Sequence, residues 1–224
     1  MSSSGIILYG VDLSPCVRTV KLTLKALNLD YEYKEVNLQT GEHLQEDFLK
    51  KNPQHTVPVL DDNGTVLWDS HAIATYLVDK YAKSDELYPK DLVQRAIINQ
   101  RLFFDASVIF ANLANVSGPF WVNGITVVPQ EKLDNLHKGL KLLETFLDST
   151  PYLAGDSLTL ADLSAGPTVT ALPAAVDIDP VVYPKVTAWL DRLNKIPYFK
   201  EINEAPAQGY VNFLRSQWTK LGDK

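Results

Sequence analysis

The 224-residue sequence has a single cysteine, no cluster of basic side chains and no hydrophobic run suited to cross a membrane. One cysteine, Cys16, cannot form an internal disulfide, and Met1–Gly5 lacks the basic start and apolar run of a secretory signal. We therefore expect a reducing, cytoplasmic location. With 27 acidic and 21 basic residues the net charge is −6, so we expect no nucleic-acid partner and no membrane partner.

The two longest uncharged stretches are residues 106–130 and 163–176. The first contains asparagine, glycine and proline, and the second is too short to span a bilayer. Both are interpreted as inner walls of a globular protein. Hydrophobic residues make up 46% and charged residues 21%, which is an ordinary globular composition, and 25.0 kDa is enough for one large or two small domains.

The first third of the chain alternates strand and helix patterns. A helical apolar spacing follows Ser14-Pro15 and runs to Leu27, and Ser70 is expected to cap a second helix. The pair Asn63-Gly64 tolerates positive φ and predicts a hairpin. Strands are expected at residues 6–9, 31–36, 57–60 and 65–68.

From Asp91 onward the strand signals largely disappear and helical spacing takes over. The segment Thr159–Asp162 resembles a capping box and predicts a helix start. Two further helices are expected, one around 186–193 and a short one from Tyr198, and His137 is interpreted as a solvated surface group. Two long bundle helices are predicted by apolar stripes: Leu92, Ala96, Phe103, Ala106, Phe110 and Leu113 in the first, and Leu133, Leu136, Leu140, Leu143 and Leu147 in the second.

This order predicts an α+β thioredoxin-like domain (βαβ-α-ββα) followed by an all-α helical bundle domain. We expect the first domain at 1–83, a linker at 84–90 and the helical domain at 91–224. Where a redox protein of that fold has Cys-Pro-x-Cys, this chain has Ser14-Pro15-Cys16-Val17, which excludes two-cysteine disulfide exchange. The serine is either a plain N-cap or a hydroxyl that donates to a thiolate carried by a ligand.

Several motifs together resemble one known family. They are Ser14-Pro15, Asn52-Pro53-Gln54-His55-Thr56-Val57-Pro58-Val59-Leu60, Asp69-Ser70-His71-Ala72-Ile73, Leu87-Tyr88-Pro89-Lys90-Asp91 and Gly155-Asp156-Ser157-Leu158-Thr159-Leu160-Ala161-Asp162. From about Ile6 to about Phe199 the chain resembles the cytosolic glutathione S-transferases that use a serine. The positions of the histidines are similar to those of the insect delta and epsilon classes, and Gly41-Glu42-His43-Leu44 favours the epsilon class.

The resemblance implies a catalytic role for Ser14, whose hydroxyl would donate a hydrogen bond to the glutathione sulfur. Val57 would offer its backbone N–H and C=O to the cysteinyl part of the tripeptide, as an added strand does. This geometry requires a cis bond between Val57 and Pro58, which few X-Pro bonds adopt. Glutathione enters as a co-substrate, and no cofactor is expected.

The resemblance also implies contacts to the two ends of glutathione. His43 and His55 would face the glycyl carboxylate, and Asp69 with Ser70 would hold the γ-glutamyl end, with His71 beside them. Three histidines within residues 43–71 also suggest a metal site. Because no cysteine or regularly spaced carboxylate completes a fourfold set, we predict no metal.

An apolar site for the second substrate is expected beside this one. Its candidate residues are Leu13, Leu38, Phe110, Phe120 and Tyr210, with Trp121 and Phe213 near them. An aromatic side chain at helical spacing is more often part of the core, so the core remains the alternative for each. Cys16 lies in the first turn of a helix, which leaves a reactive thiol as a further alternative.

The function predicted from the sequence is a glutathione transferase that conjugates the glutathione thiolate to hydrophobic electrophiles in detoxification, including lipid-peroxidation aldehydes. Glutathione-dependent peroxide reduction or isomerisation could use the same thiolate. Two alternatives are a non-catalytic protein that binds hydrophobic ligands and a scaffold for larger assemblies. The resemblance also implies a homodimer.

Overall fold

The computed structural model describes residues 5–222. Its first part is built on a four-stranded sheet in the order β2-β1-β3-β4, in which β1 runs parallel to β2 and antiparallel to β3. β3 and β4 form the hairpin that the Asn-Gly pair predicts. The strands are β1 (Ile6–Gly10), β2 (Glu32–Glu35), β3 (Val59–Asp62) and β4 (Thr65–Trp68).

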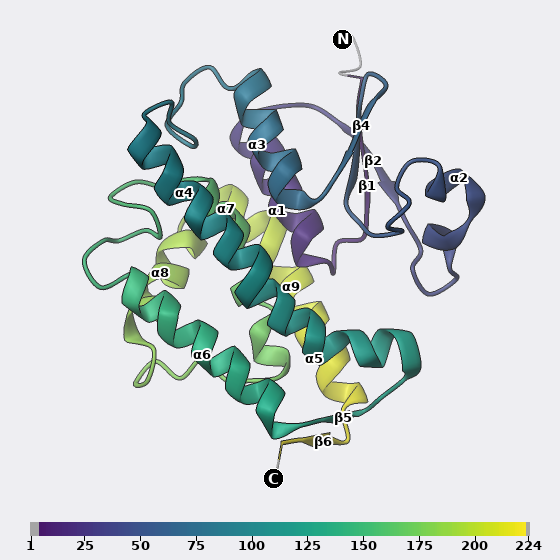
Figure 1. Ribbon diagram of the computed structural model, residues 1–224, viewed down its shortest axis with the longest axis vertical. Helices are drawn as coiled ribbons and strands as arrows, with labels where there is room; N and C mark the ends of the chain where they lie inside the picture. The colour runs from purple at the N-terminus through teal and green to yellow at the C-terminus, as the bar shows by residue number, and fades with distance from the viewer. Residues whose placement is uncertain (1–4, 223–224) are drawn as a thin grey trace.

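Helices cover both faces of this sheet (Figure 1). α1 (Pro15–Ala26) and α3 (Ser70–Tyr81) lie on the face turned toward the rest of the molecule. The opposite face carries α2 (Glu46–Leu49), preceded by the short 3₁₀ helix η1 (Glu42–Leu44). The first face buries a cluster of aliphatic side chains: Ile6, Leu8, Val17, Val20, Leu24, Leu60, Ile73 and Leu77.

The start of α1 follows from its local sequence. Ser14 is the N-cap and Pro15 occupies the first turn, where a missing N–H costs nothing. Gly10 ends β1 directly against this helix, because a Cβ at that position would lie 2.7 Å from the Val17 methyl groups. The close approach of strand and helix fixes where Ser14 stands relative to the sheet.

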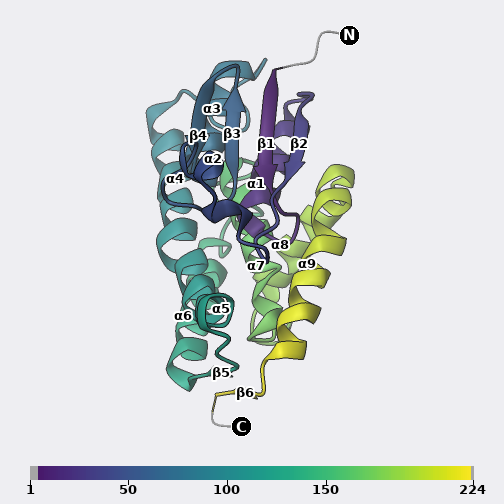
Figure 2. The same cartoon turned by 90° about the vertical axis from the view of Figure 1, so that its right-hand side faces the viewer.

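The second part is helical, with a two-stranded ribbon at its far end. Its central helix α7 is buried along all ten of its residues and lies between the other helices (Figure 2). The elements are α4 (Leu92–Phe104), the π-helical segment η2 (Asp105–Ile109), α5 (Phe110–Asn123), β5 (Val127–Val128), α6 (Gln130–Phe146), α7 (Leu160–Val169), the 3₁₀ helix η3 (Leu172–Ala174), α8 (Pro184–Asn194), α9 (Pro197–Gln217) and β6 (Lys220–Leu221).

The capping box before α7 is confirmed. The Asp162 carboxylate accepts the Thr159 backbone N–H at 2.9 Å and the Thr159 hydroxyl at 3.1 Å. It also accepts the Leu153 amide and the Trp189 indole N–H, both at 2.9 Å, and is fully buried. The expected inner wall at 163–176 is confirmed as well, since α7 and the segment after it lie in the core.

Four expectations about the helices are wrong. In the first bundle helix, Leu92 and Phe103 are 82% and 71% exposed, because the side that packs on the core lies one residue earlier, at Ile98 and Leu102. The buried side continues at Ile109, Leu113 and Val116, of which Leu113 belongs to the predicted stripe. α9 has 21 residues and is not short, since Pro206 lies within it without ending it. His137 is half-buried and hydrogen-bonds the Tyr183 hydroxyl at 2.9 Å.

The fourth correction concerns the cap of α3. Asp69, not Ser70, is the N-cap, and its carboxylate accepts the amides of His71 and Ala72 at 2.9 and 3.1 Å. The uncharged stretch 106–130 is also an inner wall only in part, since Trp121 and Val122 near its end are exposed. No helix within residues 5–222 has both the length and the apolar character needed to cross a membrane.

Candidate functional site

The strand register brings the predicted polar residues to one edge of the sheet. Val59 pairs with Tyr9 of β1 and with Trp68 of β4, and both pairings are antiparallel. The carboxyl ends of β1 and β4 therefore meet the amino end of β3. The turn that leads to Ser14, the segment before β3 and the turn that leads to α3 all open at this edge.

Ser14 lies half-buried at the start of α1. Its Oγ accepts the Val17 backbone N–H at 3.4 Å, and its own amide donates to the Val11 carbonyl at 3.0 Å. Because the hydroxyl oxygen is used as an acceptor, its proton is free to be donated to a ligand. The positive end of the α1 dipole lies at the same place.

The segment before β3 has the expected backbone. The Val57–Pro58 bond is cis. Asn52 is fully buried and holds this loop: its Nδ2 donates to the Thr56 carbonyl at 2.9 Å and the Thr56 hydroxyl at 3.0 Å, and its Oδ1 accepts the Gln54 amide at 2.9 Å. Within the described residues neither the amide nor the carbonyl of Val57 has a hydrogen-bond partner, so both can meet an extended ligand.

His43 and His55 lie close together beyond this loop, with ring centroids 6.3 Å apart. His43 lies on η1, and its Nδ1 is buried without a hydrogen-bond partner. His55 is exposed and has a φ of 49°. Burial lowers the pKa of His43, and the neighbouring His55 lowers it further, so His43 is neutral at pH 7 and can still donate a hydrogen bond.

The start of α3 is tied to the helical part through His71. His71 lies between two carboxylates, with Nε2 3.0 Å from Asp105 Oδ2 and Nδ1 3.4 Å from Asp69 Oδ1. Asp105 belongs to η2, is buried, and accepts the Ser164 hydroxyl at 2.6 Å. Burial opposes the charge on His71, but the bonds to Asp105 and Asp69 outweigh it and raise its pKa to about 9, so the ring is an imidazolium.

Cys16 does not have the lowered pKa of a reactive thiol. Burial and the nearby Asp105 charge raise its pKa to about 12, although the Ser70 hydroxyl hydrogen-bonds the sulfur and lowers it. A thiol with this pKa holds almost no thiolate at neutral pH. The alternative of a reactive Cys16 is therefore not supported. Ser70 itself is buried at the first position of α3.

The candidate residues of the apolar site are only partly gathered. Leu13 contacts α9, where a Cβ on Gly209 would lie 3.1 Å from its methyl group. Phe120 joins an aromatic group with Trp121 and Phe213, in which the rings of Trp121 and Phe213 stack with centroids 5.2 Å apart. The structure buries Tyr210 in the core, leaves Leu38 39% exposed and leaves Phe110 half-buried on α5.

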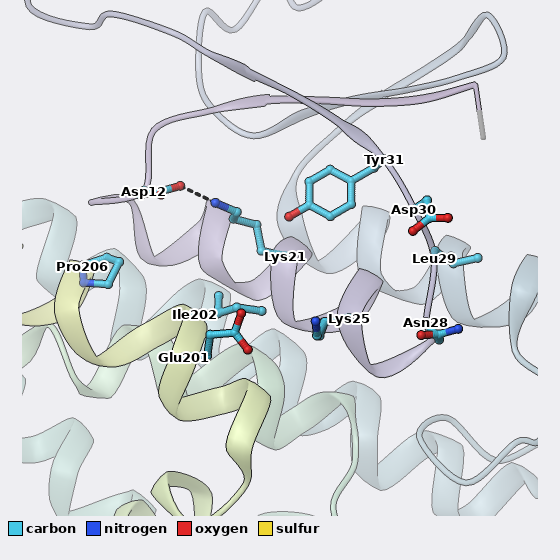
Figure 3. A pocket seen from close by; sticks show the side chains of 10 residues that line it. All are labelled: Asp12, Lys21, Lys25, Asn28, Leu29, Asp30, Tyr31, Glu201, Ile202 and Pro206. Carbon is cyan, nitrogen blue, oxygen red and sulfur yellow. Dashed lines mark hydrogen bonds and ion pairs between the residues drawn. The ribbon is translucent and has the colours of Figure 1, made fainter. Parts of the chain in front are cut away.

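A hollow of about 460 Å³ lies elsewhere, between α1, the segment leading to β2 and α9 (Figure 3). Its lining is mainly polar, with Lys21 paired to Asp12 at 2.6 Å and with Lys25 and Glu201 close by. None of the candidate site residues lines it. Within residues 5–222 no three His, Cys, Asp or Glu side chains are placed to hold a metal ion.

Comparisons with known proteins agree with this geometry. The family model described as glutathione S-transferase, N-terminal domain, matches residues 8–85, and the model of the C-terminal domain matches residues 119–192. The chain belongs to the glutathione S-transferase family. It is 44% identical over 200 residues to glutathione S-transferase 1 of Manduca sexta, a match that covers 88% of this chain and 91% of the relative.

Two solved transferases are similar over nearly the whole chain. The epsilon-class glutathione S-transferase of the housefly, Musca domestica, is 49% identical with a TM-score of 0.92, covering 95% of this chain and 98% of its own. A glutathione transferase homologue of Drosophila mojavensis, solved with bound glutathione, is 46% identical with a TM-score of 0.93, covering 96% and 99%. The resemblance to the insect epsilon class and the predicted fold of this transferase are confirmed.

Three buried polar residues of this transferase, Asn52, Asp105 and Arg18, were not singled out from the sequence. Asn52 belongs to one of the motifs that carry the family resemblance, but the sequence alone does not indicate that it holds the loop before β3. Asp105 and Arg18 carry no local signal, because each acts on residues far away in the chain. The only sequence hint for Asp105 is a carboxylate next to a long uncharged stretch.

Proposed function

We propose that this glutathione transferase binds glutathione along the sheet edge and adds its thiolate to hydrophobic electrophiles, with Ser14 as the hydroxyl that stabilises the sulfur. The observation that carries the proposal is the orientation of Ser14. Its oxygen accepts the Val17 amide while its proton is unused, at the amino end of α1. A neutral hydroxyl donates to a thiolate but cannot remove the thiol proton at pH 7.

The remaining contacts to glutathione follow the edge. The free amide and carbonyl of Val57, presented by the cis bond to Pro58, support pairing with the cysteinyl backbone. The neutral His43 and the exposed His55 lie on one side and fit the glycyl carboxylate.

The other end of the tripeptide falls at the start of α3. Asp69 is exposed there and fits the γ-glutamyl ammonium, and the buried Ser70 is the first residue of the helix. His71 acts on this end by orienting Asp69, because it is held between Asp69 and Asp105.

The energies involved are modest and can be met by these groups. A free thiol has a pKa of about 8.5, and lowering it by about two units requires roughly 2.7 kcal/mol of selective stabilisation of the anion. A hydrogen bond to a charged group contributes roughly 1.5–3 kcal/mol. The amino end of a helix adds about 0.3–1 kcal/mol.

The electrophile would enter between this edge and the helical part. Leu13 and Leu38 would border it from the first part, and Phe110, Phe120 and Tyr210 from α5 and α9. The aromatic group at Phe120 supports an apolar wall there. Such a wall selects for hydrophobic character and not for one shape, which fits a role in detoxification.

We further propose that the chain divides into domains at 84–90, works as a homodimer and is cytoplasmic. The gap between α3 and α4 supports the division, although the expected ends at 1–4 and 223–224 lie outside the described residues. The exposed apolar side chains of α4, Leu92, Val93 and Phe103, support a contact with a second copy.

Conjugation assays with chlorodinitrobenzene and phenethyl isothiocyanate test the activity. We expect Ser14→Ala to fold, to bind glutathione, and to lose roughly 10- to 100-fold in kcat/KM, the equivalent of one hydrogen bond to a charged group. Cys16→Ala is the matched control in the same turn of α1 and should keep its activity. Full activity of Ser14→Ala would remove the serine from the mechanism.

A further inference from the structure

Arg18 is a fully buried charge that no carboxylate neutralises. Its side chain is 0% exposed, and within residues 5–222 it forms no ion pair. Its Nε is buried without a hydrogen-bond partner. An unpaired charge in the interior is costly.

The partners of Arg18 are neutral. Nη1 donates to the side-chain and backbone oxygens of Asn203 on α9, and Nη2 donates to the Pro167 carbonyl of α7 at 3.4 Å. Asn203 is turned toward the guanidinium because its Nδ2 donates to the Thr170 hydroxyl at 3.1 Å. The charge is therefore stabilised by carbonyl dipoles near the C-terminal end of α7, and it remains a net positive charge.

Arg18 lies one helical turn after Ser14. Its amide donates to the Ser14 carbonyl at 3.1 Å, and positions four apart on a helix are about 5–6 Å from each other. The ionisable groups that act on Arg18 are Tyr210 on α9, Cys16 on α1 and Asp12 before it. These three groups raise the pKa of Arg18, but burial lowers it more, to about 10. The side chain is therefore charged throughout the neutral range.

The other charges near the start of α1 do not favour an anion, and Lys21 is paired with Asp12 at 2.6 Å and adds no net charge. On the α3 side the imidazolium of His71 lies between Asp69 and Asp105, which leaves one net negative charge. Asp105 also raises the pKa of Cys16, so its field reaches α1. Ser14 is neutral. Of these positive groups within the described residues, Arg18 is the one that no carboxylate pairs with.

We propose that the unpaired charge of Arg18 helps to keep the sulfur of bound glutathione anionic, as an electrostatic positioning residue behind Ser14. The inference rests on the proposed function, since it concerns the same thiolate. Arg18 makes no contact with the substrate: it acts through the low-dielectric interior of α1, α7 and α9. At an effective dielectric constant of about 20, a unit charge roughly 10 Å away lowers the thiol pKa by about one unit.

The decisive variant is Asn203→Asp, which replaces the amide that accepts the Arg18 hydrogen bond with a carboxylate. The new charge neutralises Arg18 while the arginine stays in place. The Thr170 hydroxyl, already 3.4 Å from Asn203 Oδ1, can donate to the new carboxylate. We expect the pKa of enzyme-bound glutathione, measured by thiolate absorbance in the ultraviolet, to rise by about one unit. The kcat/KM at pH 6 should fall by up to about tenfold.

The matched control is Asn203→Ala, which removes the contact and keeps the charge of Arg18. It should lower the Tm and leave the thiol pKa within about 0.3 units of the unmodified protein. Arg18→Lys should keep the low thiol pKa, and Arg18→Met should raise it by about one unit. If neither Arg18 variant folds, the two Asn203 variants decide the question.

An unchanged thiol pKa in Asn203→Asp would overturn the inference. Equal rises in Asn203→Asp and Asn203→Ala would also overturn it, because Arg18 would then be a structural clamp only. Failure of the proposed function is seen separately: the unmodified protein would show no thiolate absorbance with glutathione. A low thiol pKa in the unmodified protein that is unmoved by Asn203→Asp refutes the role of Arg18 alone.

Discussion

The sheet part meets the helical part through two buried polar contacts of different kinds. At the α3 junction, formed by His71, Asp105 and Ser164, a cation meets a carboxylate. At the α1 junction, formed by Arg18, Asn203, Pro167 and Thr170, a cation meets only carbonyl and amide dipoles.

The difference teaches how one interior can serve both stability and chemistry. Opposite charges at the α3 junction attract each other strongly, and together with Asp69 they leave one net negative charge, which disfavours an anion near α1. At the α1 junction Arg18 attracts its neutral partners less strongly, but its uncompensated charge acts on groups at the start of α1. The first contact holds the parts together, and the second acts on the site.

The largest effect is expected from breaking the α3 junction with Asp105→Ala. The substitution leaves the mostly buried His71 without its closer carboxylate and removes the acceptor of Ser164. We expect the free energy of unfolding to fall by about 3–5 kcal/mol, measured by urea denaturation. Asp105→Asn, which keeps the shape and one acceptor, is the control and should lose less.

The second effect is a pH dependence of the free energy of unfolding that comes from the α3 junction and not from the α1 junction. Because the pKa of His71 is raised from 6.5 to about 9, its contribution is fully present below pH 6.5 and is lost as the pH rises through 9. We expect up to about 3 kcal/mol less stability at pH 10 than at pH 6. Between pH 6.5 and 9 the slope should be largely lost in His71→Gln and should persist in Asn203→Ala, and a full slope in this range in His71→Gln would contradict the assignment.

The third effect is small and compares one hydroxyl at each junction. Ser164→Ala removes a hydrogen bond to a charged carboxylate and should cost about 1.5–3 kcal/mol. Thr170→Val removes bonds between neutral groups and should cost about 0.5–1.5 kcal/mol. Equal losses in the free energy of unfolding, measured by urea denaturation, would contradict the distinction between a charged partner at the α3 junction and neutral partners at the α1 junction.

Features that depend on near neighbours in the chain could be predicted from the sequence. The hairpin at Asn63-Gly64, the box between Thr159 and Asp162 and the N-cap at Ser14 each involve residues within four positions. The cis bond at Pro58 was predicted only through the family resemblance, since nothing local distinguishes it from a trans bond.

Other features were missed or wrong, either because distant contacts set them or because two neighbouring residues fit the same local role. The stripe through Leu92 and Phe103 has the right spacing, but the side that packs on the core lies one residue earlier, at Ile98 and Leu102. The cap at Asp69 was assigned one residue too late, because Asp and Ser are equally good caps and the backbone decides between them. Arg18 gave no signal, since its partners lie on α7 and α9, more than a hundred residues away.

The complete burial of α7 bears on how this molecule can be divided. All ten residues of the helix are enclosed, and α1 and α3 of the sheet part form some of that enclosure. A fragment that stops between α3 and α4 would expose the faces of α1 and α3 that α7 now covers, and the complementary fragment would expose one side of α7. The sheet part and the helical part thus share one hydrophobic interior. We expect neither fragment to remain soluble when it is synthesised without the other.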